Sequence, residues 1–161
     1  MSSNRWLVLL LFTVLCFAAG AVGSIWTSSS VNTWYARLRK PSFNPPNWIF
    51  APVWSTLYCL MALSAWLFWL AAGWSGARIG LTLFLLQLAL NAAWSGVFFG
   101  LRRPGTALVE IVLLWIAAVA TAFFFRPFSP IAYWFMVPYI LWVAFATLIN
   151  FEVWRLNRSW A

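Results

Sequence analysis

The sequence predicts an all-α integral membrane protein, built as a bundle of five transmembrane helices. Hydrophobic residues make up 65% of the 161-residue chain and charged residues only 7%. The mean hydropathy is +0.87. So little polar surface cannot cover a water-soluble domain.

Five apolar stretches set the number of spans, because a membrane-spanning helix needs about 20 mostly apolar residues. These stretches are residues 6–26, 48–72, 79–101, 106–125 and 130–154. The strands of a membrane barrel alternate apolar and polar residues over about 10 positions, whereas these stretches are apolar on every face. We find no internal repeat or second domain, so we interpret residues 1–161 as a single membrane domain with a capping loop at 27–47.

The first stretch has two interpretations. Arg5, the apolar run and the small residues of AAGAVGS are typical of a secretory signal peptide with its cleavage site. The run reaches Trp26, however, and a signal peptide has a shorter apolar region. Its length therefore favours a retained first span.

Two later spans contain proline, at Pro52 and Pro138. Each proline can kink its helix and free a backbone carbonyl, which is tolerated where it lines a cavity or is buried in protein. Packing alone is the alternative. The third span carries Gln87, Asn91 and Ser95 on one helical face, where polar side chains bind either a neighbouring helix or a ligand.

Basic residues predict the orientation of the bundle. The formal net charge is +8, but the cations are scattered through short loops, which argues against a nucleic-acid partner. Seven fall on one side of the five spans and three on the other, so the positive-inside rule predicts a cytosolic first loop and C-terminus and an outside N-terminus. The larger group is Arg37, Arg39, Lys40, Arg102, Arg103, Arg155 and Arg158, and the smaller group is Arg5, Arg78 and Arg126.

Conventional catalytic chemistry has few residues available. The chain has no histidine, and its acids are Glu110 and Glu152. Cys16 and Cys59 both lie in apolar spans without the spacing of a redox or zinc motif. We therefore expect no metal site, no catalytic triad and no cofactor. For Glu110 we favour a carboxylate near the interface, with Arg102 or Arg103 as a candidate partner.

Aromatic residues are the main chemical resource, with 14 Trp, 15 Phe and 4 Tyr. Tryptophans near the span ends are explained by the aromatic belt of the membrane interface. Others lie deeper, where an indole N–H needs a partner or a functional reason. The deeper group is Trp54, Trp66, Trp69, Trp94, Trp115 and Trp142.

A subset of these groups converges under the first loop. Helix direction and a rise of about 1.5 Å per residue place Trp54, Trp94 and Asn91 at similar depths near that side of the membrane. Trp142 and Asn150 follow on the fifth span. A cavity lined by indoles and amides is therefore expected at this level.

The third span also carries Ala92, Gly96 and Gly100 at four-residue spacing. Such a ridge of small residues lets two helices approach closely. It predicts a homodimer through this face. Packing against another helix of the same chain is the alternative.

Several motifs in order resemble the TspO/MBR family, the translocator proteins or peripheral-type benzodiazepine receptors, over nearly the whole chain. The resemblance rests on Trp34-Tyr35, Leu38, Lys40-Pro41, Pro45-Pro46, Trp48, Pro52-Val53-Trp54, Leu57-Tyr58, QLALNAAW (87–94), FFG (98–100), PYILW (138–142), Ala146-Thr147 and Asn150.

The resemblance implies a bundle, commonly dimeric, whose pocket opens toward the first loop. It implies a membrane receptor or translocator for porphyrins such as protoporphyrin IX and for other flat apolar ligands. Trp34 and Lys40 would lie on the capping loop, and Lys40 could pair with a propionate. The pocket residues carried over are Phe50, Ala51, Trp54, Asn91, Trp94, Trp142, Ala146 and Ile149.

An enzyme that degrades porphyrin with light and oxygen is the alternative function. In similar bacterial proteins, the tryptophans that match Trp54 and Trp142 are implicated in this breakdown, so these two would be the catalytic residues. The lack of an evident targeting extension favours a bacterial member, in an inner or an outer membrane. A scaffold whose aromatics serve only the bilayer is a third interpretation.

Two positions depart from the family pattern. Phe43 stands where many relatives have tryptophan, which could alter loop packing or ligand preference. The sterol-recognition pattern is outlined by Leu148, Phe151 and Arg155, with Phe151 in place of the motif tyrosine. This departure weakens the expectation of sterol binding.

Overall fold

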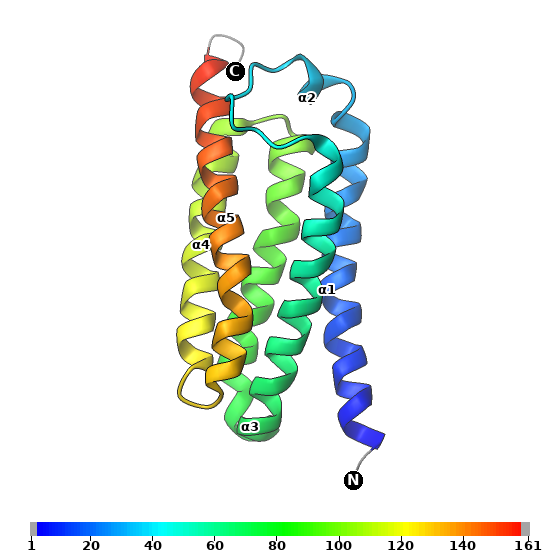
Figure 1. The fold of residues 1–161 in the computed structure, drawn as a ribbon, viewed down its shortest axis with the longest axis vertical. Helices are drawn as coiled ribbons and strands as arrows, with labels where there is room; N and C mark the ends of the chain where they lie inside the picture. Colours follow the sequence, from blue (N-terminus) through cyan, green and yellow to red (C-terminus); the bar gives the residue numbers. More distant parts are fainter. Residues whose placement is uncertain (1–2, 159–161) are drawn as a thin grey trace.

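The computed structural model describes residues 3–158 as a bundle of long helices with a single extended loop at one end (Figure 1). The elements are α1 (Ser3–Ser30), the short α2 (Trp34–Arg37), α3 (Asn47–Ser95), the π-helical η1 (Gly96–Gly100), α4 (Pro104–Phe125) and α5 (Pro130–Leu156). Four helices are long and apolar enough to cross a membrane, counting α3 and η1 together as one continuous helix.

The long α3 supplies two of the five spans, because the chain reverses at Gly73. This residue has φ 65° and ψ 172°, a combination that is accessible to glycine and costly for residues with a Cβ. The two arms of α3 run antiparallel on either side of it (Figure 1). The predicted five-helix bundle is therefore confirmed, and helix resumes directly after the glycine, before residue 79 where the third span was expected to begin.

The first span is also longer than its apolar run. The predicted end was residue 26, but α1 continues to Ser30. Thr27 donates a side-chain hydrogen bond to the carbonyl of Gly23, and Ser28 and Ser29 donate to carbonyls three residues back. The backbone of α1 itself accepts these hydrogen bonds, so the polar residues 27–29 can continue the helix beyond its apolar part.

Proline and serine define the starts of the last two spans. Pro104 and Pro130 stand in the first turns of α4 and α5, where a missing N–H costs nothing. The Ser129 side chain accepts a hydrogen bond from the N–H of Ala132 at 3.3 Å, which caps α5. Both spans begin close to their predicted first residues.

The interior contains two clusters of buried side chains. The larger cluster, which we call the main core, includes Phe12, Met61, Phe84 and Leu114. The smaller cluster lies beneath the loop, and we call it the loop-end cluster. It consists of Tyr35, Phe98, Phe99, Ala107, Ile149 and Val153.

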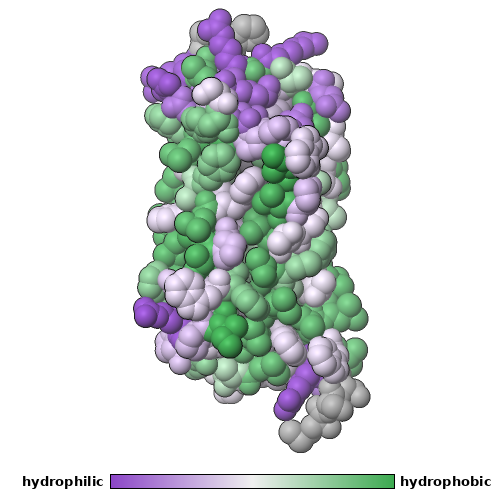
Figure 2. All heavy atoms as spheres, in the orientation of Figure 1, coloured by the Kyte–Doolittle hydropathy of each residue, from purple (hydrophilic) through white to green (hydrophobic). Residues whose placement is uncertain are grey.

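The outer surface matches a membrane protein. Hydrophobic residues cover the middle of the bundle, and hydrophilic residues gather at the end that carries the loop (Figure 2). Large side chains on this surface are well exposed, including Leu141 and Val109, each 64% exposed. Lipid rather than water is the solvent that such a surface requires. The chain is therefore a multi-pass membrane protein.

Candidate ligand site beneath the loop

The centre of the bundle holds a hydrogen-bonded group of three polar residues. Tyr58 donates to Oδ1 of Asn91 at 2.9 Å, and Nδ2 of Asn91 donates to the Tyr139 hydroxyl at 3.2 Å. All three side chains are buried. Asn91 thus joins both arms of α3 to α5, and its polar atoms are satisfied at a depth where lost partners are costly.

Aromatic rings cover this polar group on the side of the loop. Trp54 stacks on Tyr58 with ring centres 5.6 Å apart, and it meets Tyr139 edge-on at 6.4 Å. Trp142 lies one turn beyond Tyr139 on α5 and contacts Phe50 at 6.0 Å. The rings form a half-buried aromatic layer between the start of α3 and α5.

A second amide fixes the neighbouring tryptophan. The indole N–H of Trp94 donates to Oδ1 of Asn150 at 3.0 Å, and Nδ2 of Asn150 donates to the carbonyl of Pro104 at 2.7 Å. These bonds join the end of α3 to α5 and to the first residue of α4. Trp94 also packs on Phe98 at 5.3 Å, and it lies between the main core and the loop-end cluster.

The η1 segment shapes this end of the third span. Its π-helical turn buries the consecutive residues Phe98 and Phe99 against Tyr35 of α2, with ring centres 6.0 and 5.5 Å away. The Ser30 hydroxyl donates to the carbonyl of Phe99 at 2.8 Å. π-Helical turns often occur at functional sites, and this one anchors the loop that covers the aromatic layer.

Lys40 lies on this loop with its ammonium group turned back onto protein. Nζ is 4.7 Å from the centre of the Tyr35 ring and 3.3 Å from the carbonyl oxygen of Leu38. Partial burial lowers the pKa of Lys40 below its ordinary value of 10.5. Burial raises the pKa of Tyr35 above its ordinary value, and the hydrogen bond to Asn44 opposes this in part.

Three polar side chains in this part of the bundle have buried atoms without a hydrogen-bond partner among the described residues. They are Nε1 of Trp142, both amide atoms of Gln87 and both carboxyl oxygens of Glu110. The proposed pairing of Glu110 with Arg102 or Arg103 is therefore wrong. Both arginines lie exposed in the α3–α4 connection, while the carboxyl group is turned into the bundle.

The structure brings together most of the residues expected to line the pocket. Phe50, Trp54 and Trp142 form the aromatic layer described above, and Ala146 packs beside it. Asn91 lies in the polar group below. Ile149 and Trp34 belong instead with the loop-end cluster.

Ala51 and Lys40 have other surroundings. Ala51 is exposed, and its carbonyl accepts the hydroxyl of Ser55. Lys40 is on the capping loop as expected, but its ammonium group binds the loop's own carbonyls.

Sequence reasoning missed Tyr58 and Phe145 as members of the site, and it placed Tyr139 on the same face of the fifth span as Trp142 without including it among the pocket residues. A spacing signal was available, because Tyr58 follows Trp54 by four residues and Tyr139 precedes Trp142 by three, which puts each pair on one helix face. Phe145 contacts Trp142 and also Phe43 of the loop, with ring centres 5.7 and 6.2 Å away.

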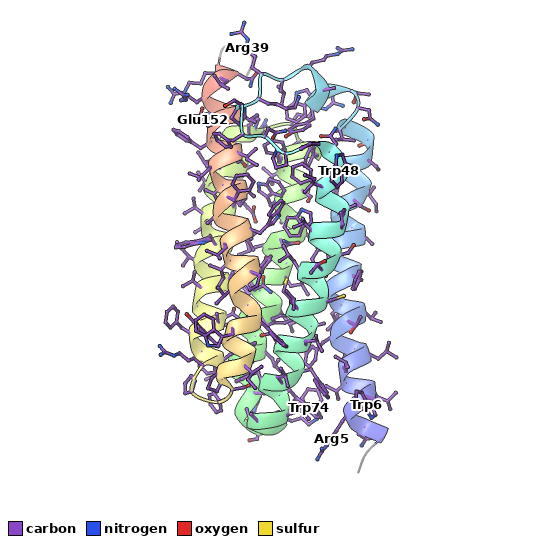
Figure 3. The ribbon with its side chains drawn as sticks, in the orientation of Figure 1. Arg5, Trp6, Arg39, Trp48, Trp74 and Glu152 are labelled. Atoms are coloured by element: carbon purple, nitrogen blue, oxygen red, sulfur yellow. The ribbon has the colours of Figure 1, made fainter. Side chains whose placement is uncertain are left out.

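Two of the deeper tryptophans belong to the opposite end of the bundle. Trp66 stacks on Trp6 at 5.7 Å and donates its N–H to the carbonyl of Arg5 at 3.0 Å. Trp69 packs against Trp74. Arg5, Trp6 and Trp74 lie at this end, far from Arg39 and Glu152 at the loop end (Figure 3).

The small-residue ridge of the third span is used within the chain. Gly96 and Gly100 lie against the Trp26 ring of α1, and a Cβ on Gly100 would be 2.8 Å from Cδ1 of that ring. This packing corresponds to the alternative interpretation. Gly100 is still exposed, so a homodimer through Ala92, Gly96 and Gly100 stays a prediction.

Comparison with known proteins agrees with this architecture. The model of the TspO/MBR family matches residues 12–155. The tryptophan-rich protein TspO of Chlorobaculum tepidum is 43% identical over 153 residues, covering 94% of this chain and 96% of that protein. The human translocator protein is 41% identical over 157 residues, covering 96% and 93%.

A third relative is the tryptophan-rich sensory protein of Cereibacter sphaeroides, 37% identical over 152 residues, which covers 94% of this chain and 92% of that protein. The family match and these identities extend over both arms of α3, the loop and the aromatic layer. The chain belongs to the TspO/MBR family.

Proposed function

We propose that this protein is a membrane receptor or translocator that binds tetrapyrroles such as protoporphyrin IX beneath loop 31–46. The observation that carries the proposal is the half-buried aromatic layer of Phe50, Trp54 and Trp142 directly above a buried amide. Family membership supports the same site. A flat apolar macrocycle fits between indole faces better than a compact polar solute does.

The physical basis is ring stacking combined with polar contacts at the edges. Stacking of a flat ring on an aromatic side chain is worth about 1–3 kcal/mol per ring, as measured for nucleobases. Nε1 of Trp142 is buried without a hydrogen-bond partner among residues 3–158, and it would donate to an acceptor on the ligand. Lys40, at the edge of the loop, would turn from the Leu38 carbonyl to a ligand carboxylate.

The test is a titration of the purified protein with protoporphyrin IX, followed by quenching of tryptophan fluorescence. Saturable quenching is expected, with weaker binding in Trp54→Phe and Trp142→Phe. Trp66→Phe is the matched control, because Trp66 stacks on Trp6 at the other end of the bundle. Equal affinity in all four proteins would exclude this site.

A second candidate function is light-dependent oxidation of the bound porphyrin. The supporting observation is the contact of Trp54 with Tyr58, which continues by hydrogen bonds through Asn91 to Tyr139. Such a chain of oxidisable rings can donate an electron to an excited porphyrin and take it back once dioxygen has added to the porphyrin radical, so that the protein is unchanged overall. One molecule of dioxygen added across a meso carbon–carbon double bond, with cleavage of that bond, would leave two carbonyl groups and open the ring.

Illumination in the presence and absence of dioxygen distinguishes the two functions. A receptor returns intact porphyrin at the rate of the free light reaction. An enzyme opens the ring faster, and it loses this acceleration without dioxygen and in Trp54→Phe. The absorption spectrum of the porphyrin reports the outcome.

We also propose that the loop end faces the cytosol. The seven cations of the larger group lie at this end, which follows from the helix directions in Figure 1. Single cysteines at Asn32 and Ser75, both exposed and at opposite ends, provide the test in a background without Cys16 and Cys59. An impermeant maleimide added to intact cells should label Ser75→Cys and not Asn32→Cys, and the reverse pattern would contradict the orientation.

A further inference from the structure

The side chain of Asn157 connects the end of α5 to the loop through both of its polar atoms. Its Oδ1 accepts a hydrogen bond from the backbone N–H of Arg39 at 3.0 Å, and its Nδ2 donates to the backbone carbonyl of Arg39 at 2.9 Å. Nδ2 also donates to the carbonyl of Val153 at 2.7 Å. The amide is therefore oriented by its own helix and pairs with Arg39 as a neighbouring strand would.

The location of this contact is unusual for an asparagine near the end of the chain. Asn157 is only 6% exposed, and 118 positions separate it from Arg39. The residues on either side, Leu156 and Arg158, are not buried. Burial of one polar side chain among exposed neighbours points to a specific role for its hydrogen bonds.

The two halves of the loop are held differently. The first half is fixed by Tyr35, which lies in the loop-end cluster. The hydroxyl of Tyr35 also donates to Oδ1 of Asn44 at 3.0 Å, which joins the second half of the loop to the first. In the second half, residues 38–45, the hydrogen bonds to a spanning helix among the described residues are the two with Asn157. An aromatic contact between Phe43 and Phe145 is added to them.

This second half lies over the aromatic layer. Phe43 touches Phe145, which in turn touches Trp142, and Lys40 directly follows the residue that Asn157 holds. Moving residues 38–45 away from α5 would break the two bonds of Asn157 with Arg39 and the bond of Tyr35 with Asn44. It would uncover the layer while the Tyr35 ring stays in the loop-end cluster. The two hydrogen bonds of Asn157, at ordinary strength, should lower the equilibrium constant for this opening by roughly 10- to 100-fold.

We propose that Asn157 is the latch of a ligand gate, a positioning residue that holds residues 38–45 over the site and thereby sets how fast a ligand enters and leaves. This inference rests on the proposed function, since the gated ligand is the flat apolar molecule bound by the aromatic layer. The end of α5 then controls access to the site without touching the ligand.

Stopped-flow quenching of the full-length protein by protoporphyrin IX is the test. In Asn157→Ala, the association and dissociation rate constants should both rise by roughly 10-fold, with a change of less than ~3-fold in Kd. A residue that only supports the fold would not speed association. Unchanged rates, or slower association, would overturn the latch.

Two further variants make the result specific. Asn157→Asp keeps an acceptor for the N–H of Arg39 but loses the donor, so its rates should lie between those of the wild type and Asn157→Ala. Arg155→Gln, on the same turn of α5, breaks the exposed pair with Glu152 and should leave the rates unchanged. Rates in Arg155→Gln equal to those in Asn157→Ala would also contradict the proposal.

Hydrogen exchange separates failure of the latch from failure of the proposed function. The amide of Arg39 should exchange roughly 10-fold faster in Asn157→Ala than in the wild type, with or without ligand. If the wild type shows no saturable porphyrin binding, the proposed function fails, and this exchange still decides the latch. Equal exchange in the two proteins refutes it.

Discussion

The two ends of the bundle are built differently. At the end opposite the loop, the connections are short and the side chains interlock: Phe68 stacks on Phe125 with ring centres 4.0 Å apart and meets Phe128 at 5.3 Å. At the loop end, residues 31–46 are held by the buried Tyr35, by the hydrogen bonds of Asn157 and by aromatic contacts of Trp34 and Phe43. We infer that the first end is a rigid base and the second a cover that can open.

The burial of polar groups differs in the same way. The main core near the base buries Phe68 and Phe125 completely. Toward the loop end come Asn91 and Asn150, whose side chains bond to neighbouring helices, and Asn157, whose side chain bonds to the loop. Specific polar contacts, rather than packing alone, therefore determine the geometry around the candidate site.

The largest expected effect concerns the base. Phe68→Ala removes a fully buried ring and its stack on Phe125, and it should lower the free energy of unfolding by about 3–5 kcal/mol. Phe123→Ala, at a ring that is 53% exposed, is the control and should cost much less. Equal losses, measured by denaturant unfolding in mixed micelles, would mean that the base is not tightly packed.

The next effect compares two amides one turn apart. Asn91→Ala leaves the hydroxyls of Tyr58 and Tyr139 without a partner and should cost about 1–3 kcal/mol. Gln87→Met removes an amide whose buried atoms have no partner among the described residues. It should leave the stability unchanged or raise it. A loss in Gln87→Met equal to that in Asn91→Ala would show that both amides are equally satisfied.

A pair of glycines on the second arm of α3 tests the closeness of packing at the base. A Cβ on Gly80 would lie 2.5 Å from Cζ of Phe68, whereas a Cβ on Gly76 would meet only Ala72 at 3.5 Å. Gly80→Ala should therefore cost about 1–3 kcal/mol, while Gly76→Ala should be neutral or stabilising. Thermal unfolding of the two variants side by side provides the measurement.

The smallest effect is a pH dependence at the cover. Burial lowers the pKa of Lys40, so half of the Lys40 side chains have lost their charge at a pH below 10.5. Affinity for an anionic porphyrin should then decline as the pH rises toward that value. Lys40→Arg keeps its charge and should abolish the decline. The neighbouring Tyr35 does not produce the decline, because burial raises its pKa. An equal decline in Lys40→Arg would remove Lys40 from ligand recognition.

Much of the fold could be predicted from apolar run lengths, because a bilayer requires each span to be long, helical and apolar. Details that depend on single residues could not. Gly73 reverses α3 in one residue, and the hydroxyls of residues 27–29 extend α1 past its apolar run. Neither feature changes the hydropathy that marked the spans.

The candidate site was predictable where residues share a helix face and unpredictable where distant segments meet. The spacing of Trp54 and Tyr58 is visible in the sequence, whereas the bond of Asn157 to Arg39 depends on how the loop crosses the bundle. Glu110 is a second example. Its closeness in sequence to Arg102 and Arg103 suggested an ion pair, but the carboxyl group is buried and the two arginines are exposed.

The most direct test of the difference between the two ends is hydrogen exchange of the protein in lipid nanodiscs, with and without protoporphyrin IX. We predict slower exchange in residues 31–58 on binding and no change in residues 66–80 and 125–133. Protection confined to the base, or no protection in the loop under saturating ligand, would contradict the account.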